Sequence, residues 1–245
     1  GHLVPGPNPI SPLAVLFMIR GLLLIITLAT SDIAAGEPLR VAVAANFRAT
    51  LEQINQAYIA GGGSNVVLSS ASTGVLATQI RHGAPFDLFF SADEPTVAAL
   101  EAESLGGQSQ CYALGQLALV GGDLDDLGDP GKTLAIANPE TAPYGRAAAE
   151  VLARTELASA TDRQLIRGAS VLQAFQFWRA GAVDLALVAR SQAPQAQPVP
   201  VAWHQSLRQH VLVLRDSPDA RAYLRWLGSD TVRQMIITAG YLPCP

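Results

Sequence analysis

The chain has 245 residues, of which 49% are hydrophobic and 15% are charged. This length suits one large α/β domain or two lobes of about 100 residues each, and the apolar fraction excludes an intrinsically disordered chain. With 16 Lys and Arg against 20 Asp and Glu, the net charge is −4, so we expect no nucleic-acid partner. The two cysteines, Cys111 and Cys244, are too few for a disulfide-rich scaffold or a cysteine zinc site.

The first 36 residues read as a leader that does not belong to the fold. An apolar run at 21–29 follows Arg20, and small residues occupy 34–36. This order is typical of a secretory signal peptide, and the run is shorter than the roughly 20 residues that a membrane-spanning helix needs. Residues 1–17 precede the first methionine and resemble an expression-vector remnant or an over-extended start. We therefore predict an exported protein, with an uncleaved membrane anchor as the alternative.

Strands and helices alternate in the first part of the remaining chain. A buried strand is predicted at 39–44, and Asn46 is expected to cap the helix that follows. Further strands are predicted at 66–69 and 86–91, and a short helix opens at 72–74 between them. This strand–helix–strand–helix–strand order predicts a parallel sheet covered by helices, which is an α/β fold.

The same alternation continues toward the C-terminus. Strands are predicted at 116–120, 133–137, 166–169, 184–189 and 210–214. Helices are predicted to open at Tyr144-Gly145 and after Ser170, and two more close the chain, the second around 231–239. The sequence therefore contains a second group of strands and helices, of the size of a second lobe.

Common motifs of nucleotide-binding and hydrolytic sites are missing from the sequence. No GxGxxG follows the first strand, and GxxxxGK[ST], GxSxG and HExxH do not occur. His82, His204 and His210 form no cluster in the sequence, which disfavours a metal or histidine-based catalytic site. Asp87 and Asp93 resemble a catalytic acid pair, but we expect Asp93 to cap the next helix and Asp87 to join a structural network. The chain is predicted not to be an enzyme.

Several predicted strands end in a small or polar residue directly before a helix. These junctions are Ala45-Asn46, Ser72-Thr73, Tyr144-Gly145 and Ser170-Val171. Helix starts carry free backbone N–H groups and a partial positive charge, and in open α/β sheets they gather at the carboxyl ends of the strands. Such a cleft can bind an anion without Lys or Arg. Ordinary helix capping is the alternative interpretation of the same residues.

Five stretches are distinctive in combination. They are VAVAANF at 41–47, SASTG at 70–74, QIRHGAPFDLFFSADE at 79–94, IANPETAPYG at 136–145 and AGYLP near the end. Together they resemble the periplasmic molybdate-binding proteins of ABC transporters over about 37–245. The resemblance implies an α/β, two-lobed periplasmic binding protein fold, each lobe a mainly parallel sheet flanked by helices, with the ligand in the hinge cleft. On this pattern lobe 1 spans 37–115 and 210–245, and lobe 2 spans 116–209.

The resemblance also implies a set of ligand-binding residues. These are Asn46, Ala45, Thr73 and Ser72 from lobe 1, and Tyr144 and Val171 from lobe 2. Asn46 and Thr73 can donate from side chain and backbone, whereas the lobe 2 residues would donate mainly through main-chain N–H groups. Ala189 stands where some relatives have a tyrosine that contacts the ligand, so this contact is expected to be lost. Arg146 is expected to form a salt bridge near the cleft rather than bind the anion.

The ligand implied by the resemblance is an oxyanion that carries no proton. Neutral donors without a carboxylate acceptor should bind molybdate and tungstate and reject protonated phosphate, whereas only cavity size would exclude sulfate. No cofactor is expected, and any metal would be present only within the oxyanion. The implied protein is a periplasmic monomer that delivers its ligand to a membrane ABC transporter permease. The alternatives are the same fold with another anion such as sulfate, or a secreted enzyme.

Both cysteines would lie in lobe 1. In an oxidising periplasm Cys111 and Cys244 could pair in a disulfide that ties the crossover region to the C-terminus. Geometry decides this pairing, and the sequence does not supply it.

Overall fold

The computed structural model describes residues 1–3, 6, 36–154, 156–157 and 162–245. Pro38–Pro245 form one compact unit, separate from Gly1–Glu37. The predicted signal peptide, with its apolar run at 21–29, lies outside the described residues. In the part of the chain that is described, no helix combines the length and the apolarity needed to cross a membrane.

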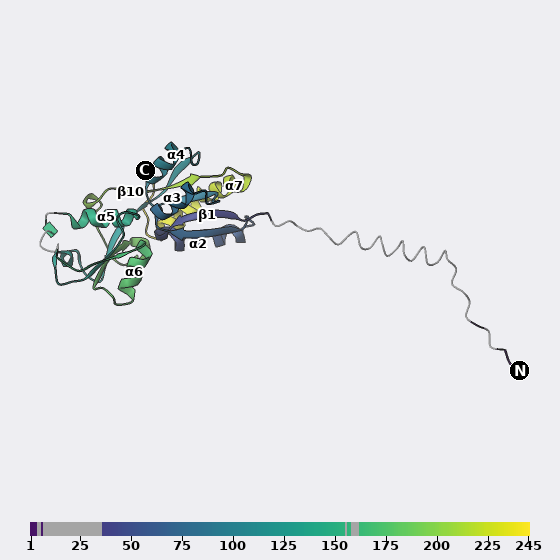
Figure 1. Ribbon diagram of the computed structural model, residues 1–245, viewed down its shortest axis with the longest axis horizontal. Helices are drawn as coiled ribbons and strands as arrows, with labels where there is room; N and C mark the ends of the chain where they lie inside the picture. Colours follow the sequence, from purple (N-terminus) through teal and green to yellow (C-terminus); the bar gives the residue numbers. More distant parts are fainter. Residues whose placement is uncertain (4–5, 7–35, 155, 158–161) are drawn as a thin grey trace. The chain divides into compact units, whose positions relative to one another are not determined.

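The first of two sheets has five strands in the order β2-β1-β3-β10-β4. Figure 1 labels β1 and β10 of this sheet. Their bounds are β1 Leu39–Ala44, β2 Val66–Ala71, β3 Leu88–Ser91, β4 Ser109–Gly115 and β10 Leu207–Val213. β1 pairs in parallel with β2 and β3, whereas β10 is antiparallel to β3 and β4. β4 is absent from the predicted strands, because its apolar and polar residues do not alternate and it lies half-buried at the edge of the sheet.

The second sheet repeats this plan in the order β7-β6-β8-β5-β9. Its strands are β5 Leu117–Val120, β6 Leu134–Ala137, β7 Leu165–Gly168, β8 Leu185–Ala189 and β9 Gln197–Pro198. β6 is parallel to β7 and β8, and β5 is antiparallel to β8 and β9. Both sheets are therefore mixed rather than mainly parallel. The reason is that β5 and β10 enter from the neighbouring sheet, so they run opposite to the strands that lead toward it.

Helices flank both sheets. The α-helices are α2 Arg48–Ala60, α3 Thr73–Arg81, α4 Glu94–Ala102, α5 Pro143–Leu152, α6 Val171–Arg179, α7 Pro218–Leu227 and α8 Asp230–Thr238. Short 3-10 helices are η1 Ala45–Phe47, η2 Leu124–Gly128, η4 Arg190–Gln192 and η5 Val201–Trp203. Each sheet with its helices is one lobe of an α/β fold.

The hydrophobic core follows the pleat of the strands. Val41 and Val43 of β1 pack with residues of α2, α7 and α8, whereas Ala42 between them packs with residues of α3 and α4. Successive side chains of a strand point to opposite faces, so a strand covered on both faces is apolar throughout. A separate core joins the second sheet to α5 and α6.

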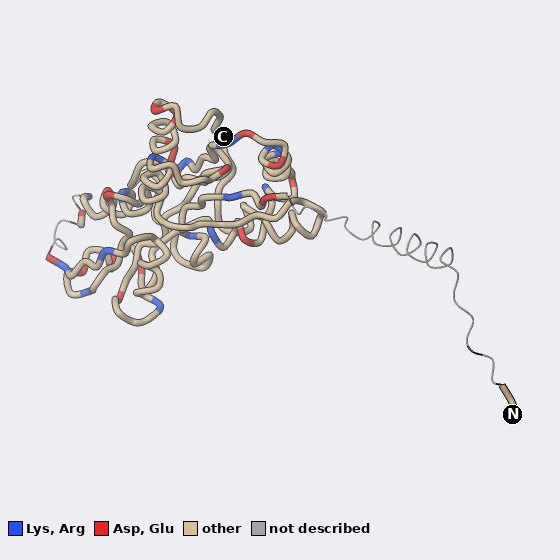
Figure 2. The backbone as a smooth tube through the Cα atoms, turned by 45° about the vertical axis from the view of Figure 1, so that its right-hand side comes forward, with Lys and Arg blue, Asp and Glu red and all other residues tan. Residues whose placement is uncertain are grey.

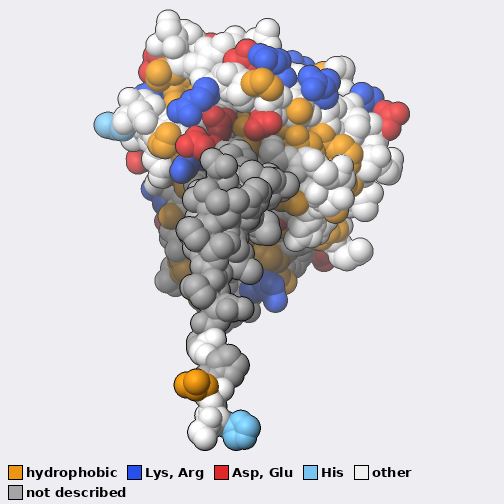
Figure 3. Space-filling view, turned by 90° about the vertical axis from the view of Figure 1, so that its right-hand side faces the viewer, with side chains coloured by type: hydrophobic (Ala, Val, Ile, Leu, Met, Phe, Trp, Pro, Cys, Tyr) orange, Lys and Arg blue, Asp and Glu red, His pale blue; other side chains and the backbone are white. Residues whose placement is uncertain are grey.

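Charged side chains are spread over the folded unit. Figure 2 shows basic and acidic residues distributed along most of the elements. On the face shown in Figure 3, basic, acidic and hydrophobic side chains are interspersed. This face carries no broad basic surface.

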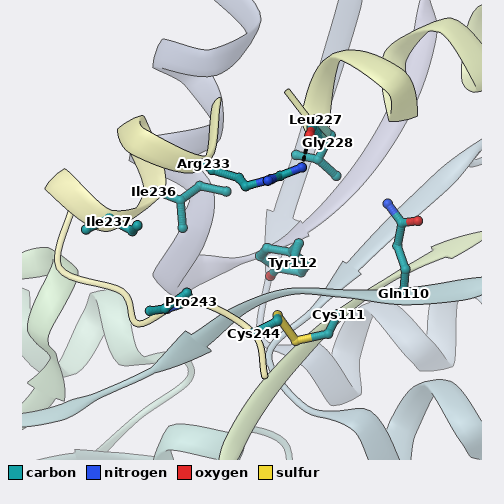
Figure 4. Close-up of a pocket in the computed structure, with 10 residues that line it drawn as sticks. All are labelled: Gln110, Cys111, Tyr112, Leu227, Gly228, Arg233, Ile236, Ile237, Pro243 and Cys244. Atoms are coloured by element: carbon teal, nitrogen blue, oxygen red, sulfur yellow. Dashed lines mark hydrogen bonds between the residues drawn. A yellow bond between two sulfur atoms is a disulfide. The ribbon is translucent and has the colours of Figure 1, made fainter. Parts of the chain in front are cut away.

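The C-terminal tail is fastened to β4. Leu114 and Leu242 exchange two backbone hydrogen bonds, of 2.9 and 3.0 Å. Two residues further on, Cys244 forms a disulfide with Cys111, with their Cα atoms 6.1 Å apart, an ordinary separation for a disulfide. Figure 4 shows this disulfide at one side of a pocket that Tyr112 also lines. The tail residues between α8 and Cys244 are thereby held against the first sheet.

We expect replacement of both cysteines by serine to lower the free energy of unfolding by about 2–5 kcal/mol. The disulfide closes a loop with a sequence separation of 133, so its loss returns much conformational freedom to the unfolded chain. Urea titration of the oxidised protein and of the double variant checks this. The double variant should not respond to a reducing agent, and equal stabilities of the two proteins would contradict the expectation.

Candidate functional site

A small cavity lies where helix starts from the two sheets converge. It is lined by Ala44, Ala45, Asn46, Ser72, Thr73, Ala92, Ala142, Pro143, Tyr144 and Val171. All six residues that the sequence resemblance implies are among them, although they come from four separate parts of the chain. The cavity volume is about 10 Å³, which is about the room that one water needs. This room is too small for a tetrahedral oxyanion, so the lining residues would have to shift to admit one.

The cavity walls are strand ends followed by helix starts. Thr73 and Val171 are the first residues of α3 and α6, and Tyr144 is the second residue of α5, after Pro143. Backbone N–H groups in the first turn have no partner within their helix, and the helix dipole gives them a positive potential. Within the described part of the chain, no charged side chain lines the cavity. The site can thus offer several N–H donors without a cation.

Two residues that line the cavity carry hydroxyl groups, which differ in their hydrogen bonding. Thr73 Oγ1 accepts a hydrogen bond of 3.0 Å from the backbone N–H of Ala92, which leaves its own hydrogen free to donate. Ser72 precedes α3, yet its hydroxyl makes no capping bond. Its Oγ is buried and has no hydrogen-bond partner among the described residues. An unsatisfied buried hydroxyl costs about 1–3 kcal/mol, and an acceptor placed in the cavity would remove this cost.

Helix α3 and the loop before α5 touch directly beside the cavity. The backbone N–H of Gly74 donates to the carbonyl of Thr141 at 2.8 Å. A Cβ atom on Gly74 would lie 2.9 Å from that same carbonyl oxygen, closer than real Cβ contacts. Only glycine allows the backbones to approach this closely, so the second residue of α3 is part of the closure between the sheets.

Asn46 does not cap a helix, contrary to the prediction. It lies inside η1, and α2 begins at Arg48 without a side-chain cap. Its buried Nδ2 instead donates to Gln209 Oε1 at 3.0 Å and to Tyr241 Oη at 3.0 Å. Both amide hydrogens are used in these bonds, so its backbone N–H, in the first turn of η1, is the donor still available to the cavity. Tertiary partners have replaced the local cap.

Six side chains beside the cavity form a hydrogen-bonded group that we name the hinge cluster. They are Asn46, Tyr112, Tyr144, Ser191, Gln209 and Tyr241. Tyr144 and Ser191 come from α5 and η4, next to the second sheet. The other four come from η1, β4, β10 and the C-terminal tail. The cluster joins the two sheets through uncharged groups. Apart from Asn46 and Tyr144, its members are absent from the predicted site, and of these only Tyr241 lies in a stretch that the resemblance quotes.

Charged residues near the cavity are paired with one another. Arg146 forms a salt bridge with Asp93, as predicted. Asp93 also caps α4, because its Oδ1 accepts from the backbone N–H of Thr96 at 3.1 Å. Asp87 accepts from the backbone N–H of Arg40 at 2.7 Å, so its predicted structural role is confirmed. No group of three or more His, Cys, Asp or Glu that could hold a metal ion is found among the described residues.

Comparisons with known proteins identify the family. Residues 39–242 match the family model of bacterial extracellular solute-binding proteins. The chain belongs to this family. The molybdate-binding protein ModA of Azotobacter vinelandii is 37% identical over 223 residues, which are 82% of this chain and 88% of that protein. ModA of Rhodobacter capsulatus is 33% identical over 226 residues, 85% of this chain and 89% of that protein.

A solved structure supports the same assignment. The periplasmic molybdate-binding protein of Azotobacter vinelandii superposes with a TM-score of 0.77 at 31% identity, covering 84% of this chain and 100% of that one. The predicted α/β, two-lobed fold is thereby confirmed. The matched family and relatives are named as binding proteins, and this chain is a solute-binding protein rather than an enzyme.

We expect the solute-binding protein to lose stability as the pH rises above about 10. Burial raises the pKa of four phenols above the ordinary value, namely Tyr112, Tyr144, Tyr223 and Tyr241. The unfolded chain ionises its phenols near the ordinary value, so above it the unfolded state binds fewer protons and the free energy of unfolding falls. Urea titrations across this range, with tyrosinate absorbance recorded alongside, check this. Full ionisation of these phenols near the ordinary pKa in a protein that stays folded would contradict it.

Proposed function

We propose that this chain is a periplasmic binding protein that captures molybdate, and also tungstate, in the cavity between the two sheets. Its relatives at 37% and 33% identity are named molybdate-binding proteins. The observation that carries the proposal is an uncharged cavity, lined by helix starts from both sheets, with a buried Ser72 hydroxyl that has no partner among the described residues. This donor set suits a fully deprotonated oxyanion.

The proposed ligand contacts divide between the two sheets. The first sheet supplies the backbone N–H groups of Ala45 and Asn46 and the hydroxyls of Ser72 and Thr73, and the second supplies N–H groups at the starts of α5 and α6. Each hydrogen bond to a charged acceptor contributes about 1.5–3 kcal/mol, and each favourable helix end adds about 0.3–1 kcal/mol. Several such contacts together can offset the cost of removing a dianion from water.

Selectivity follows from the absence of a carboxylate among the described lining residues. A protonated phosphate must donate its hydrogen, which the N–H groups of the site cannot accept. Only the Ser72 and Thr73 hydroxyls could accept it, and a neutral hydroxyl is a weaker acceptor than a carboxylate. Molybdate and tungstate carry no proton at neutral pH and are nearly equal in size, so one cavity accommodates both. Sulfate is smaller, so only the fit between the cavity and the anion can select against it.

The proposed transport cycle depends on closure of the two lobes around the ligand. We place lobe 1 at 37–115 and 210–245 and lobe 2 at 116–209, joined where β4 ends at Gly115 and β5 begins at Leu117. The lobes close on the oxyanion, and the loaded monomer delivers it to the membrane ABC transporter permease without any cofactor. Export would use the signal peptide within residues 1–36.

Thermal melting of the protein with four oxyanions tests this proposal. Molybdate or tungstate at about 100 times its Kd should add roughly 2.7 kcal/mol, a rise of about 5–11 °C in melting temperature. Phosphate should have no effect. A clear response to sulfate with none to molybdate would replace the proposal by a sulfate-binding function.

Replacement Ser72→Ala should separate ligand binding from stability. The melting temperature of the ligand-free protein should stay the same or rise slightly, because the hydroxyl has no partner in the described part of the chain. Molybdate affinity, measured by calorimetry, should fall by about 10–100-fold, since one hydrogen bond to a charged ligand is lost. Arg146→Ala is the control, because Arg146 is paired with Asp93. The molybdate affinity of this variant should stay within several-fold of that of the unmodified protein. A loss of about a thousandfold in Arg146→Ala would show that a cation holds the anion.

A further inference from the structure

Gln209 is a polar side chain with no exposure to solvent. It lies on β10, the strand that returns from the second sheet, at a shift in register between Gln209 and His210. Such irregularities re-aim a side chain out of the regular pattern of a strand. A fully buried amide is costly unless its donors and acceptors are paired, so its partners indicate why it is there.

Three hydrogen bonds satisfy the Gln209 amide. Its Nε2 donates to Tyr144 Oη at 2.9 Å. Its Oε1 accepts from Asn46 Nδ2 at 3.0 Å and from Tyr112 Oη at 2.9 Å. Gly115 makes room for this arrangement, because a Cβ atom there would lie 2.2 Å from Tyr144 Oη and 2.5 Å from Gln209 Nε2.

Two of these partners line opposite walls of the cavity. Asn46 follows β1 of the first sheet, and Tyr144 begins α5 beside the second. Asn46 has a further partner in Tyr241, whereas among the described residues the hydroxyl of Tyr144 otherwise meets only Asn46 Nδ2, at 3.5 Å. Gln209 is therefore the main polar anchor of Tyr144, and it fixes Tyr144 relative to Asn46. It does not line the cavity itself.

We propose that Gln209 is a positioning residue for the oxyanion site, which holds the Asn46 and Tyr144 walls in register without touching the ligand. This inference rests on the proposed function. A neutral amide suits the role because it donates to one wall, accepts from the other and adds no charge. A carboxylate of the same shape would lose the donor and bring a buried negative charge close to an anion.

Two variants and a matched control test the proposal. Gln209→Met keeps the length of the side chain and removes its hydrogen bonds, and molybdate affinity should fall by about tenfold or more. The molybdate affinity of Gln209→Glu should fall by about a hundredfold at about pH 8.5 and recover toward that of the unmodified protein at about pH 6. The reason is that burial favours the protonated acid, which can again donate to Tyr144. Gln110→Glu makes the same substitution at an exposed position of β4 and should match the unmodified protein at both pH values.

The pH recovery distinguishes positioning from mere packing. A side chain that only fills space would give Gln209→Glu an equal loss at both pH values, and that result would overturn the proposal. Unchanged affinity in both Gln209 variants would overturn it as well.

A ligand-free measurement keeps the inference separate from the proposed function. Hydrogen exchange of Gln209→Met should speed up in the peptides that cover 41–47 and 142–147, relative to Gln110→Glu. Faster exchange in both walls supports positioning even if the unmodified protein binds none of the oxyanions, a result that would reject only the proposed function. Exchange that changes only around residue 209 would overturn the positioning role.

Discussion

The direction in which the chain crosses between the two sheets governs the rest of the structure. It leaves the first sheet after Gly115, enters the second at Leu117 and returns at Leu207. Strands that enter from the other sheet run away from the junction, so β5 and β10 are antiparallel to their central neighbours. The parallel strands then run toward the junction, and the helices that follow them begin there. One constraint of chain direction thus gathers backbone donors from both sheets at a single cavity.

The site and its immediate surroundings also carry no net charge. No charged side chain lines the cavity among the described residues, and the nearby Arg146 and Asp93 neutralise each other. Phenols are uncharged donors and acceptors at neutral pH, and in the hinge cluster burial raises the pKa of three of them still further. Uncharged hydrogen bonds suit a junction between two lobes, because breaking them leaves no unpaired buried ion.

Local patterns in the sequence predict most elements but not the contacts between them. The strand predicted at 39–44 has the bounds of β1, and the six implied ligand residues do meet at one cavity. Asn46 was misread as a helix cap, because a cap and a tertiary hydrogen bond use the same amide and only the fold decides between them. Gln209 gives no local signal: it is one polar residue in a strand, and its partners lie at least 65 positions away in the chain.

The central place of β10 bears on how the first sheet can assemble. This strand lies between β3 and β4, yet it is the last strand in the chain. During synthesis β4 therefore has no neighbour to pair with until the whole second sheet has been made. Contacts between residues so distant in sequence slow folding, because a long loop must close before any pairing energy is gained. The nascent chain consequently remains without a complete first sheet for longer than one built from consecutive hairpins.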